Sequence, residues 1–259
     1  MDSFPGKSIV GRAAEPLLQL LFPPRCAVCD GLLAPEEFSA GIHGACAKKL
    51  FPVGENFCMH CGQPLGGDRE YCLDCAGRFL QGRAGSKEPL SYIAQGRGVF
   101  EYRGAVKKTM YRFKYSNRRE YAVFLGRAAG ERWGDWIAAN GIEAVVPVPM
   151  YRGKKRRRGY DQAELLAKAL AGHMGLVCET KALKRTVNTK PQKKLNVEER
   201  KNNLKNAFQT APFIVQYKRV LLVDDIYTTG STVEAAAKEL RRAGVEQVYF
   251  LAACIGRGL

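Results

Sequence analysis

The run from Val220 to Thr232 combines apolar residues, two acids and several hydroxyls in an order that suits phosphate chemistry. Val220 to Val223 has the pattern of a buried strand, and Asp224 and Asp225 follow it directly. A hydroxyl-rich turn then opens a helix, and its residues are Thr228, Thr229, Gly230, Ser231 and Thr232. Backbone N–H groups at such a helix N-terminus hold phosphate, while the two carboxylates accept hydrogen bonds from sugar hydroxyls. The run therefore predicts a site for a sugar phosphate; an ordinary N-capped helix after a strand is the alternative.

Seven of the nine cysteines form a second set suited to chemistry, because they fall between residues 26 and 75. A two-residue gap lets two ligands from one tight turn reach the same ion, and two such turns complete a tetrahedron. The spacing predicts two structural zinc sites, one from Cys26, Cys29, His43 and Cys46, and one from Cys58, Cys61, Cys72 and Cys75. His43 stands where a fourth cysteine is expected, so the zinc count is one or two. Scattered reduced thiols, and pairing of ligands across the two quartets, are the alternatives.

Apolar periodicity predicts that an α/β domain surrounds the acidic run from about residue 91. The expected strands are 99–102, 144–148, 219–223 and 248–253, and the expected helices are 105–113, 120–136, 161–173 and 231–243. Their alternation indicates a mostly parallel sheet flanked by helices, with Asp224 and Asp225 at its carboxyl edge. We expect a lead-in helix in residues 1–22, a linker over 77–90 and a basic loop after Met150. His60 is interpreted as a bystander, and Cys178 and Cys254 as core residues.

The acidic run closely resembles the signature of type I phosphoribosyltransferases, which bind 5-phosphoribosyl 1-diphosphate (PRPP). Other residues narrow the resemblance to the ComF family of bacterial competence proteins: Pro147 to Met150, Arg158 to Ala163, Leu165 to Ala167, Arg185, Thr189, Gln192, Leu195, Glu199, Arg200, Asn203, Ala207 and Phe208. That family joins an N-terminal double zinc ribbon to a domain with the type I phosphoribosyltransferase fold. The resemblance implies a ribbon module over 23–80 and a phosphoribosyltransferase-like domain over 91–259. Asp161 departs from the family, which usually has Asn there.

The resemblance also implies roles for individual residues. Asp224 and Asp225 would contact the ribose hydroxyls, and the residues from Thr228 to Thr232 would hold the 5′-phosphate. Arg152 would lie near the diphosphate, which Mg²⁺ bridges, and residues 185–205 would form a hood over the site. The implied function is DNA uptake in natural competence, with PRPP, single-stranded DNA and the uptake machinery as partners. An active phosphoribosyltransferase with an unidentified base or amine acceptor, and a PRPP sensor without turnover, are the alternatives.

The charge of the chain points to polyanionic partners. There are 41 Lys and Arg against 25 Asp and Glu, a formal charge of +16; residues 1–82 carry −2 and the remainder +18. Aromatic residues are interleaved with a basic run over 97–119, a combination that suits single strands. The residues predicted to bind nucleic acid are Lys154, Lys155, Arg156, Arg157, Arg158, Lys193 and Lys194. A solvated basic face is the alternative.

The sequence also indicates a location. No secretory signal pattern opens the chain, and no apolar stretch is long enough to span a bilayer. We therefore expect a cytoplasmic protein, which the membrane partners of the family would bring to the inner face of the membrane. The oligomeric state is left open.

Overall fold

A computed structural model of the chain describes residues 23–80, 89–187 and 207–256. The lead-in helix expected in residues 1–22, most of the expected hood, and Lys193 and Lys194 therefore lie outside the described residues. The strands are β1 (Gly96–Glu101), β2 (Ala144–Pro147), β3 (Val177–Cys178), β4 (Leu183–Arg185), β5 (Phe208–Thr210), β6 (Arg219–Tyr227) and β7 (Gln247–Ile255). The helices are η1 (Pro35–Glu37), α2 (Gly44–Ala47), α3 (Leu73–Leu80), α4 (Gly104–Tyr115), α5 (Tyr121–Ala139), α6 (Arg152–Arg158), α7 (Gln162–Met174), η3 (Pro212–Gln216) and α9 (Ser231–Arg242).

A five-stranded parallel sheet with the order β1-β7-β6-β2-β3 organises the fold. Successive side chains of a strand point to opposite faces, and β6 and β7 are apolar on both. Val220 and Leu222 pack into one core with Phe250, while Leu221 and Val223 pack into another. Burial on both faces explains why these strands read as continuous apolar runs, the pattern of a parallel sheet covered by helices.

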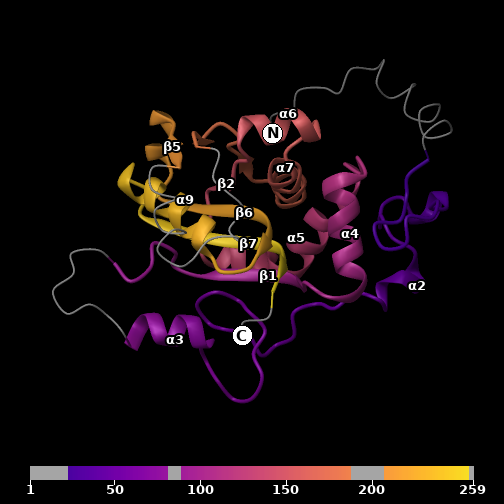
Figure 1. The fold of residues 1–259 in the computed structure, drawn as a ribbon, viewed down its shortest axis with the longest axis horizontal. Coiled ribbons are helices and arrows are strands. Elements are labelled where there is room, and N and C mark those ends of the chain that lie inside the picture. Colours follow the sequence, from indigo (N-terminus) through magenta and orange to yellow (C-terminus); the bar gives the residue numbers. More distant parts are fainter. Residues whose placement is uncertain (1–22, 81–88, 188–206, 257–259) are drawn as a thin grey trace, which may run out of the picture.

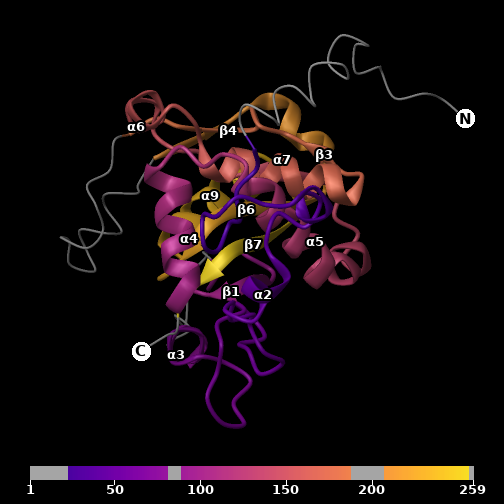
Figure 2. The ribbon, with the colours of Figure 1, turned by 90° about the vertical axis from the view of Figure 1, so that its right-hand side faces the viewer.

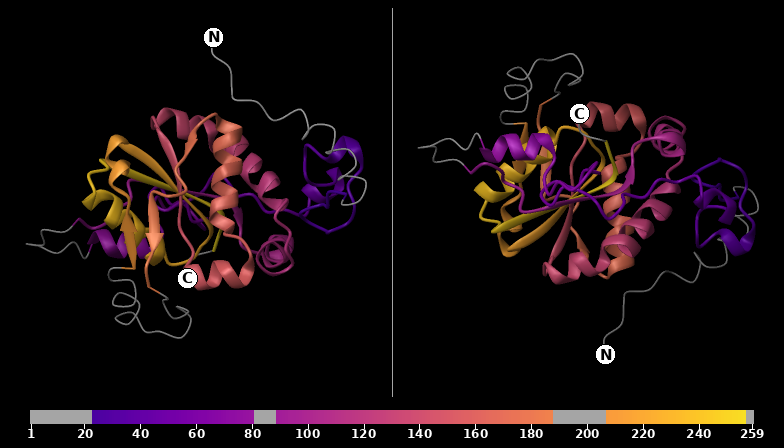
Figure 3. Two further views of the ribbon diagram at one scale, coloured as in Figure 1. Left: turned by 90° about the horizontal axis from the view of Figure 1, so that it is seen from above. Right: turned by 90° about the horizontal axis from the view of Figure 1, so that it is seen from below.

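Helices cover the two faces unequally. The helices α4, α5 and α7 pack on one face of the sheet, and α9 packs on the other beside the small β4–β5 sheet. Figures 1 and 3 show α4 and α5 on the far side of the sheet from α9. Mixed α/β architecture with a mainly parallel sheet confirms the predicted fold class. Cys254 in β7 is buried in the second of these cores, as expected, whereas Cys178 in β3 is only partly buried and packs against that core.

Three local expectations were wrong. The basic segment after Met150 is not a loop: it forms α6, because Lys and Arg are good helix formers and Gly159 ends the helix in the left-handed region (φ 86°). The strand at Val220 continues past Asp225 to Tyr227, since β7 pairs with it up to Ile255. The expected linker over 77–90 begins inside α3, which ends at Leu80.

The cysteine module wraps around the sheet rather than standing apart from it. Between the two cysteine quartets, the chain runs beside β1: Val53 N–H donates to Val99 O and Glu101 N–H donates to Phe51 O. These bonds cover an edge that would otherwise be exposed. The short α2 lies beside α4 and α3 lies at the other end of the long axis (Figures 1 and 2). Within the described residues, no helix is long and apolar enough to cross a bilayer.

Candidate functional site

The order of the strands places a switch point between β6 and β2. From β2 the chain continues to β3 on one side, whereas from β6 it continues to β7 on the other. Open parallel sheets bind ligands beyond the carboxyl ends of strands at such a point. Backbone pairing between β2 and β6 ends at Pro147 and Val223, so Asp224 is the first residue of β6 beyond that pairing. The two acids therefore lie at the expected edge.

The turn after β6 is shaped for an anion. It exposes Thr228 and Thr229, and Thr229 Oγ1 lies 3.0 Å from Ser231 Oγ. Gly230 caps α9 with φ 74°, and a Cβ there would lie 2.5 Å from the hydroxyl of Tyr227. Only glycine fits both constraints. The backbone thus turns tightly into the N-terminus of a twelve-residue helix, where N–H groups and the helix dipole favour a phosphate.

The two acids differ in their partners. Asp225 is paired with Lys114 of α4, whose Nζ lies 2.9 Å from both carboxylate oxygens. Asp224 accepts a hydrogen bond from the backbone N–H of Asp225 at 2.8 Å. Burial and the neighbouring charge of Asp225 raise the pKa of Asp224 to about 8, although Lys114 opposes the shift. One carboxylate is therefore held by a lysine, while the other lies beside it without such a partner in the described residues and offers its oxygens to a hydroxyl.

The segment after β2 forms the other wall of the switch point. Asp161 is buried and caps α7: its Oδ1 accepts from Ala163 N–H and Glu164 N–H, while its Oδ2 accepts from Met150 N–H at 2.8 Å. Asp161 thus ties the start of the segment to the helix that follows it. This role needs only hydrogen-bond acceptors, which both oxygens of the aspartate supply. Arg152, expected near a diphosphate, is exposed at the first residue of α6.

A cationic pocket of about 250 Å³ lies between the C-terminal end of α4 and α6. Its walls carry Lys114, Tyr115, Asn117, Lys154, Arg157, Arg158 and Tyr160. Burial and then the charges of Arg185, Arg158 and Arg157 lower the pKa of Lys154. Among the described residues neither Lys154 nor Arg157 forms an ion pair, whereas Lys155 pairs with Glu164. Within the described residues, Lys154 and Arg157 thus give the pocket positive charge that no acid neutralises, whereas Lys114 in its wall is paired with Asp225.

Most of the basic run over 97–119 serves the protein itself. Arg97 is buried and its guanidinium lies 4.8 Å from the ring centroid of Phe57 and 5.0 Å from that of Trp136. Arg112 donates to Val28 O at 3.1 Å, and Arg118 pairs with Asp30 at 2.7 Å. These three cations of the run, whose composition suits single strands, therefore have partners within the protein. Of its aromatic residues, Phe113 is buried, while Tyr111 and Tyr115 are exposed side by side with ring centroids 5.1 Å apart.

The second cysteine quartet is buried and brings its four sulfurs within 4.8 Å of one another. The sulfurs of Cys61 and Cys72 are 3.6 Å apart, close to the separation of about 3.8 Å that two thiolates on one tetrahedral zinc adopt. Hydrogen bonds among the thiols lower the pKa of Cys58 and raise that of Cys61. Such a group gives up protons to a divalent metal, and four protein ligands leave no open position. His60 lies between Cys58 and Cys61, but its ring nitrogens are not among the clustered ligand atoms.

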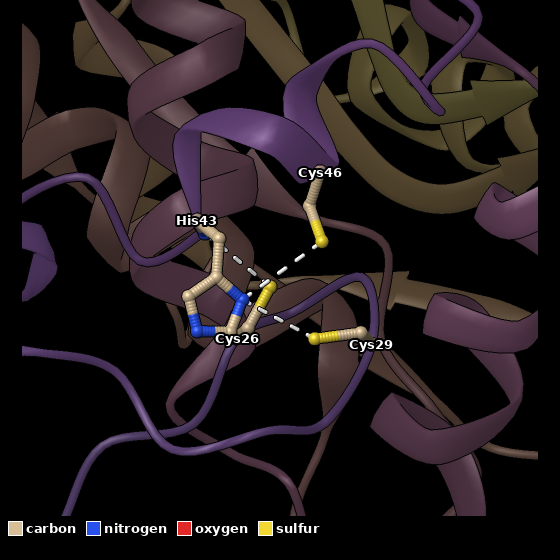
Figure 4. A group of neighbouring side chains, drawn as sticks. All are labelled: Cys26, Cys29, His43 and Cys46. Carbon is tan, nitrogen blue, oxygen red and sulfur yellow. Dashed lines mark hydrogen bonds between the residues drawn. The ribbon is translucent and has the colours of Figure 1, made fainter.

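The first quartet has the same two-residue gap within each pair of ligands, but it has three thiols and an imidazole (Figure 4). His43 Nδ1 faces the sulfurs of Cys29 at 3.3 Å and Cys46 at 3.8 Å. His43 Nε2 donates to Leu32 O at 2.8 Å, which leaves the lone pair on Nδ1, the atom that faces the sulfurs. The structure therefore groups the ligands within each quartet and not across them, and both groups have the donor set of a structural zinc ribbon.

Two residues of the site carried no signal in the sequence that would mark their roles. Lys114 was part of a basic run, and only the packing of α4 against the sheet shows that it pairs with Asp225. Gln63 follows the Cys58–Cys61 turn of the second quartet and is buried, with its amide Nε2 3.3 Å from both Thr228 O and Gly256 O. A contact across such a separation in sequence has no local pattern.

Family models match both parts of the chain. The model described as a double zinc ribbon domain matches residues 17–76, and the phosphoribosyl transferase domain model matches residues 156–257. The first match fits the two cysteine clusters, and the second contains the acids and the hydroxyl-rich turn.

Curated relatives match almost the full length. Competence protein F of Haemophilus influenzae is 32% identical over 86% of this chain and 93% of its own length. DNA utilization protein YhgH of Salmonella typhi is 30% identical over 91% of this chain and 98% of its own. Competence protein ComFC of Bacillus subtilis is 27% identical over 85% of this chain and 89% of its own length. Proteins of competence and DNA utilization thus share both parts of this chain in the same order.

Proposed function

This chain belongs to the ComF family of competence proteins, and on that premise we propose that it binds PRPP at the carboxyl edge of β6 and single-stranded DNA on the neighbouring basic surface during DNA uptake. The observation that carries the first half is the juxtaposition of two acids, a tight hydroxyl-rich turn and a helix N-terminus at the switch point of the sheet.

PRPP has groups that match each part of this edge. Asp224 and Asp225 would accept from the ribose hydroxyls, with Lys114 holding Asp225 in place. The turn from Thr228 to Thr232 would hold the 5′-phosphate at the start of α9. The diphosphate would extend toward Arg152 and the segment after β2, and Mg²⁺ would come with it, bound by phosphate and ribose oxygens.

The second half rests on the pocket between α4 and α6. Lys154 and Arg157 have no acidic partner among the described residues, so they are available for backbone phosphates. Tyr111 and Tyr115 form an exposed aromatic pair on α4, and Arg158 lies 5.0 Å from the ring centroid of Tyr115. Single strands bind where exposed aromatic rings lie beside cations, because bases stack on the rings while the cations neutralise phosphates.

Substitution of the acids tests the PRPP site. We expect the double variant Asp224→Ala, Asp225→Ala to lose Mg²⁺-PRPP binding measured by isothermal titration calorimetry, because the ribose hydroxyls lose both acceptors. A variant with Glu131→Ala, which removes an exposed acid of α5 paired only with Arg127, serves as the control and should bind as the wild type does. Equal affinity in the double variant and the wild type would refute the assignment.

Salt dependence tests the DNA surface. The logarithm of the association constant for an oligodeoxythymidine should fall linearly with the logarithm of salt concentration, with a slope of about −0.7 per phosphate neutralised. The double variant Lys154→Gln, Arg157→Gln should make this slope about 1.4 less steep. The matched control Lys48→Gln, Lys49→Gln removes two exposed charges near the first quartet and should leave the slope unchanged. A DNA affinity that changes neither with salt concentration nor in the Lys154→Gln, Arg157→Gln variant would contradict the proposed DNA surface.

Turnover is a separate matter, because a PRPP site serves an enzyme and a sensor equally. If the chain is a transferase, diphosphate leaves C1′ through an oxocarbenium-like state, and the cations beside α6 stabilise the developing charge. Release of diphosphate from PRPP, screened with bases, amines and DNA, separates the two. Release that depends on an added acceptor identifies a phosphoribosyltransferase, whereas binding without release identifies a PRPP sensor.

A further inference from the structure

The second zinc ribbon contacts the phosphate turn directly. Gln63 is buried at 2% exposure between two segments of the sheet domain. Its side-chain amide lies 3.3 Å from the carbonyl of Thr228, the first residue of the turn after β6, and 3.3 Å from that of Gly256, which follows β7. The backbone of Gly256 in turn donates to Tyr227 O at 2.9 Å. One side chain of the ribbon thus joins the two strand ends that border the turn.

The ribbon also controls charge at the start of α9. Glu234 lies in the first turn of that helix, where a free carboxylate would repel a bound phosphate. Arg78 of α3 forms an ion pair with Glu234, and Ser91 Oγ and Tyr92 N–H donate to the same carboxylate at 2.7 and 3.0 Å. Glu234 is therefore neutralised by Arg78 from the ribbon side and held by two hydrogen bonds from the segment before β1.

The ribbon is held closely enough to transmit these contacts. Gly62 has φ 74°, and a Cβ there would lie 2.7 Å from Gly96 O and 2.8 Å from Arg97 Cα. Gly96 N–H donates to His60 O at 2.7 Å. All four cysteines of this quartet belong to the same apolar core as Tyr227 and Phe250, whose rings stack with centroids 4.6 Å apart. The Cys58–Cys61 turn, which Gln63 follows, therefore has little room to move relative to β6 and β7.

From these contacts we propose that the second zinc ribbon positions the phosphate turn, with Gln63 as a positioning residue and Arg78 as the group that neutralises Glu234. The inference rests on the proposed PRPP site, since it names what orders that site. Zinc in the second quartet would keep the Cys58–Cys61 turn rigid. Gln63 links this turn to Thr228, and Arg78 links α3 to Glu234 at the start of α9. The metal module then belongs to the ligand site even though it supplies no ligand contact.

The first test compares Gln63→Leu with Arg132→Gln. Arg132 also joins the cysteine module to the sheet domain, by a bond from its guanidinium to Val53 O at 2.8 Å, but it lies on α5, away from the turn. Both variants should keep the zinc content of the wild type. In the absence of ligand, amide hydrogen exchange at residues 229–232 should become faster in Gln63→Leu and stay unchanged in Arg132→Gln. Wild-type exchange in Gln63→Leu overturns the proposal.

Two ligand probes localise the effect. Gln63→Leu should bind ribose 5-phosphate about tenfold more weakly while its affinity for inorganic diphosphate stays within about twofold of wild type, because only the 5′-phosphate turn loses its support. A general loss of structure would weaken both ligands alike and overturn the proposal. If the wild type binds neither ribose 5-phosphate nor PRPP, the proposed function fails, and the exchange experiment still decides the role of Gln63.

A charge rescue tests the second contact. Arg78→Gln should weaken ribose 5-phosphate binding by several-fold, since Glu234 then carries an uncompensated charge beside the phosphate. Adding Glu234→Gln should restore the affinity to within about twofold of wild type. Failure of the double variant to recover, with zinc content and melting temperature unchanged, would contradict the assigned role of Arg78.

Discussion

The two cysteine quartets share a spacing but lie in different surroundings. The second is buried throughout and is part of the core that α9 and the sheet form. The first has an exposed Cys29 and a partly exposed His43, and its two buried cysteines pack in a small separate cluster with Val28 and Leu33. The same ligand pattern thus stabilises a piece of the domain core in one place and a docked module in the other.

The attachments of the two quartets differ in their balance of polar and apolar contacts. The first is held to α4, α5 and the segment between them by several polar bonds: Thr109 Oγ1 to Ala27 O at 2.6 Å, Arg112 to Val28 O, and Arg118 and Tyr121 to Asp30. Its apolar contacts with the domain core are made by Ala27, Ile42 and Leu50. In the second, all four cysteines lie in the domain core, with a bond from Gln63 to the phosphate turn and an ion pair from Arg78 to Glu234 of α9. Apolar burial is insensitive to salt and pH, whereas ion pairs are not. The quartets should therefore respond differently to the same perturbation.

The largest effect is expected from Cys61→Ser. Loss of a buried ligand removes the metal from the second quartet and leaves polar groups in the core, a combination worth several kcal/mol. We expect a fall of about 10 °C or more in melting temperature, followed by circular dichroism, together with loss of one zinc per chain by elemental analysis. A variant that loses this zinc and melts as the wild type does would show that the second quartet is not part of the core.

A smaller effect is expected from Cys29→Ser in the first quartet. The chain should again lose one zinc, but the sheet domain keeps its own core, so the melting temperature should fall by less than half as much as in Cys61→Ser. PRPP affinity should stay within about threefold of wild type. Loss of both zinc ions in this variant would contradict the separation of the two clusters.

Asp30→Asn probes the polar attachment of the first quartet. Partial burial disfavours its charge, but hydrogen bonds from Arg118 and Tyr121 outweigh burial and hold the pKa of Asp30 below its usual value. The ionised carboxylate therefore contributes stability that is present above the usual Asp pKa near 4 and is lost as pH falls through the lower folded value. The variant should lower the free energy of unfolding by about 1–2 kcal/mol at pH 7, measured in urea.

The same measurement at low pH gives the control for Asp30. Once Asp30 is protonated, variant and wild type should unfold alike, and high salt should also narrow the difference at pH 7. Asp74→Asn, at an exposed acid of the second ribbon, should change stability by less than about 0.5 kcal/mol at either pH. A difference that persists unchanged at acid pH contradicts the ion-pair explanation.

The smallest effect is expected from His43→Cys, which converts the first quartet to four thiolates. Zinc content should be kept and the melting temperature should change by no more than about 2 °C, because a thiolate is an equivalent tetrahedral ligand. His43→Ala should lose one zinc instead. Equal zinc content in the alanine and cysteine variants would show that His43 is not a ligand.

Much of the fold could be predicted because its signals are local. Most strands of the central sheet and the helices between them follow from apolar periodicity, and α7 (Gln162–Met174) lies where a helix over 161–173 was predicted. Two such predictions failed. Pairing with β7 extends β6 to Tyr227, and the cations after Met150 form a helix that ends at Gly159 instead of a loop. The domain boundaries and the roles of the site residues stay predictions.

The sequence by itself determined the residue types and their spacing: two ligand quartets, two adjacent acids before a hydroxyl-rich turn, and a basic domain after a slightly acidic module. Tertiary structure alone decided which cations have partners within the described part of the chain. Arg97 lies among aromatic rings, Lys114 holds Asp225, and Lys154 and Arg157 face a pocket. The physical reason is that ligand spacing and periodicity act over a few residues, whereas the partner of a charge depends on segments that only the folded chain brings together.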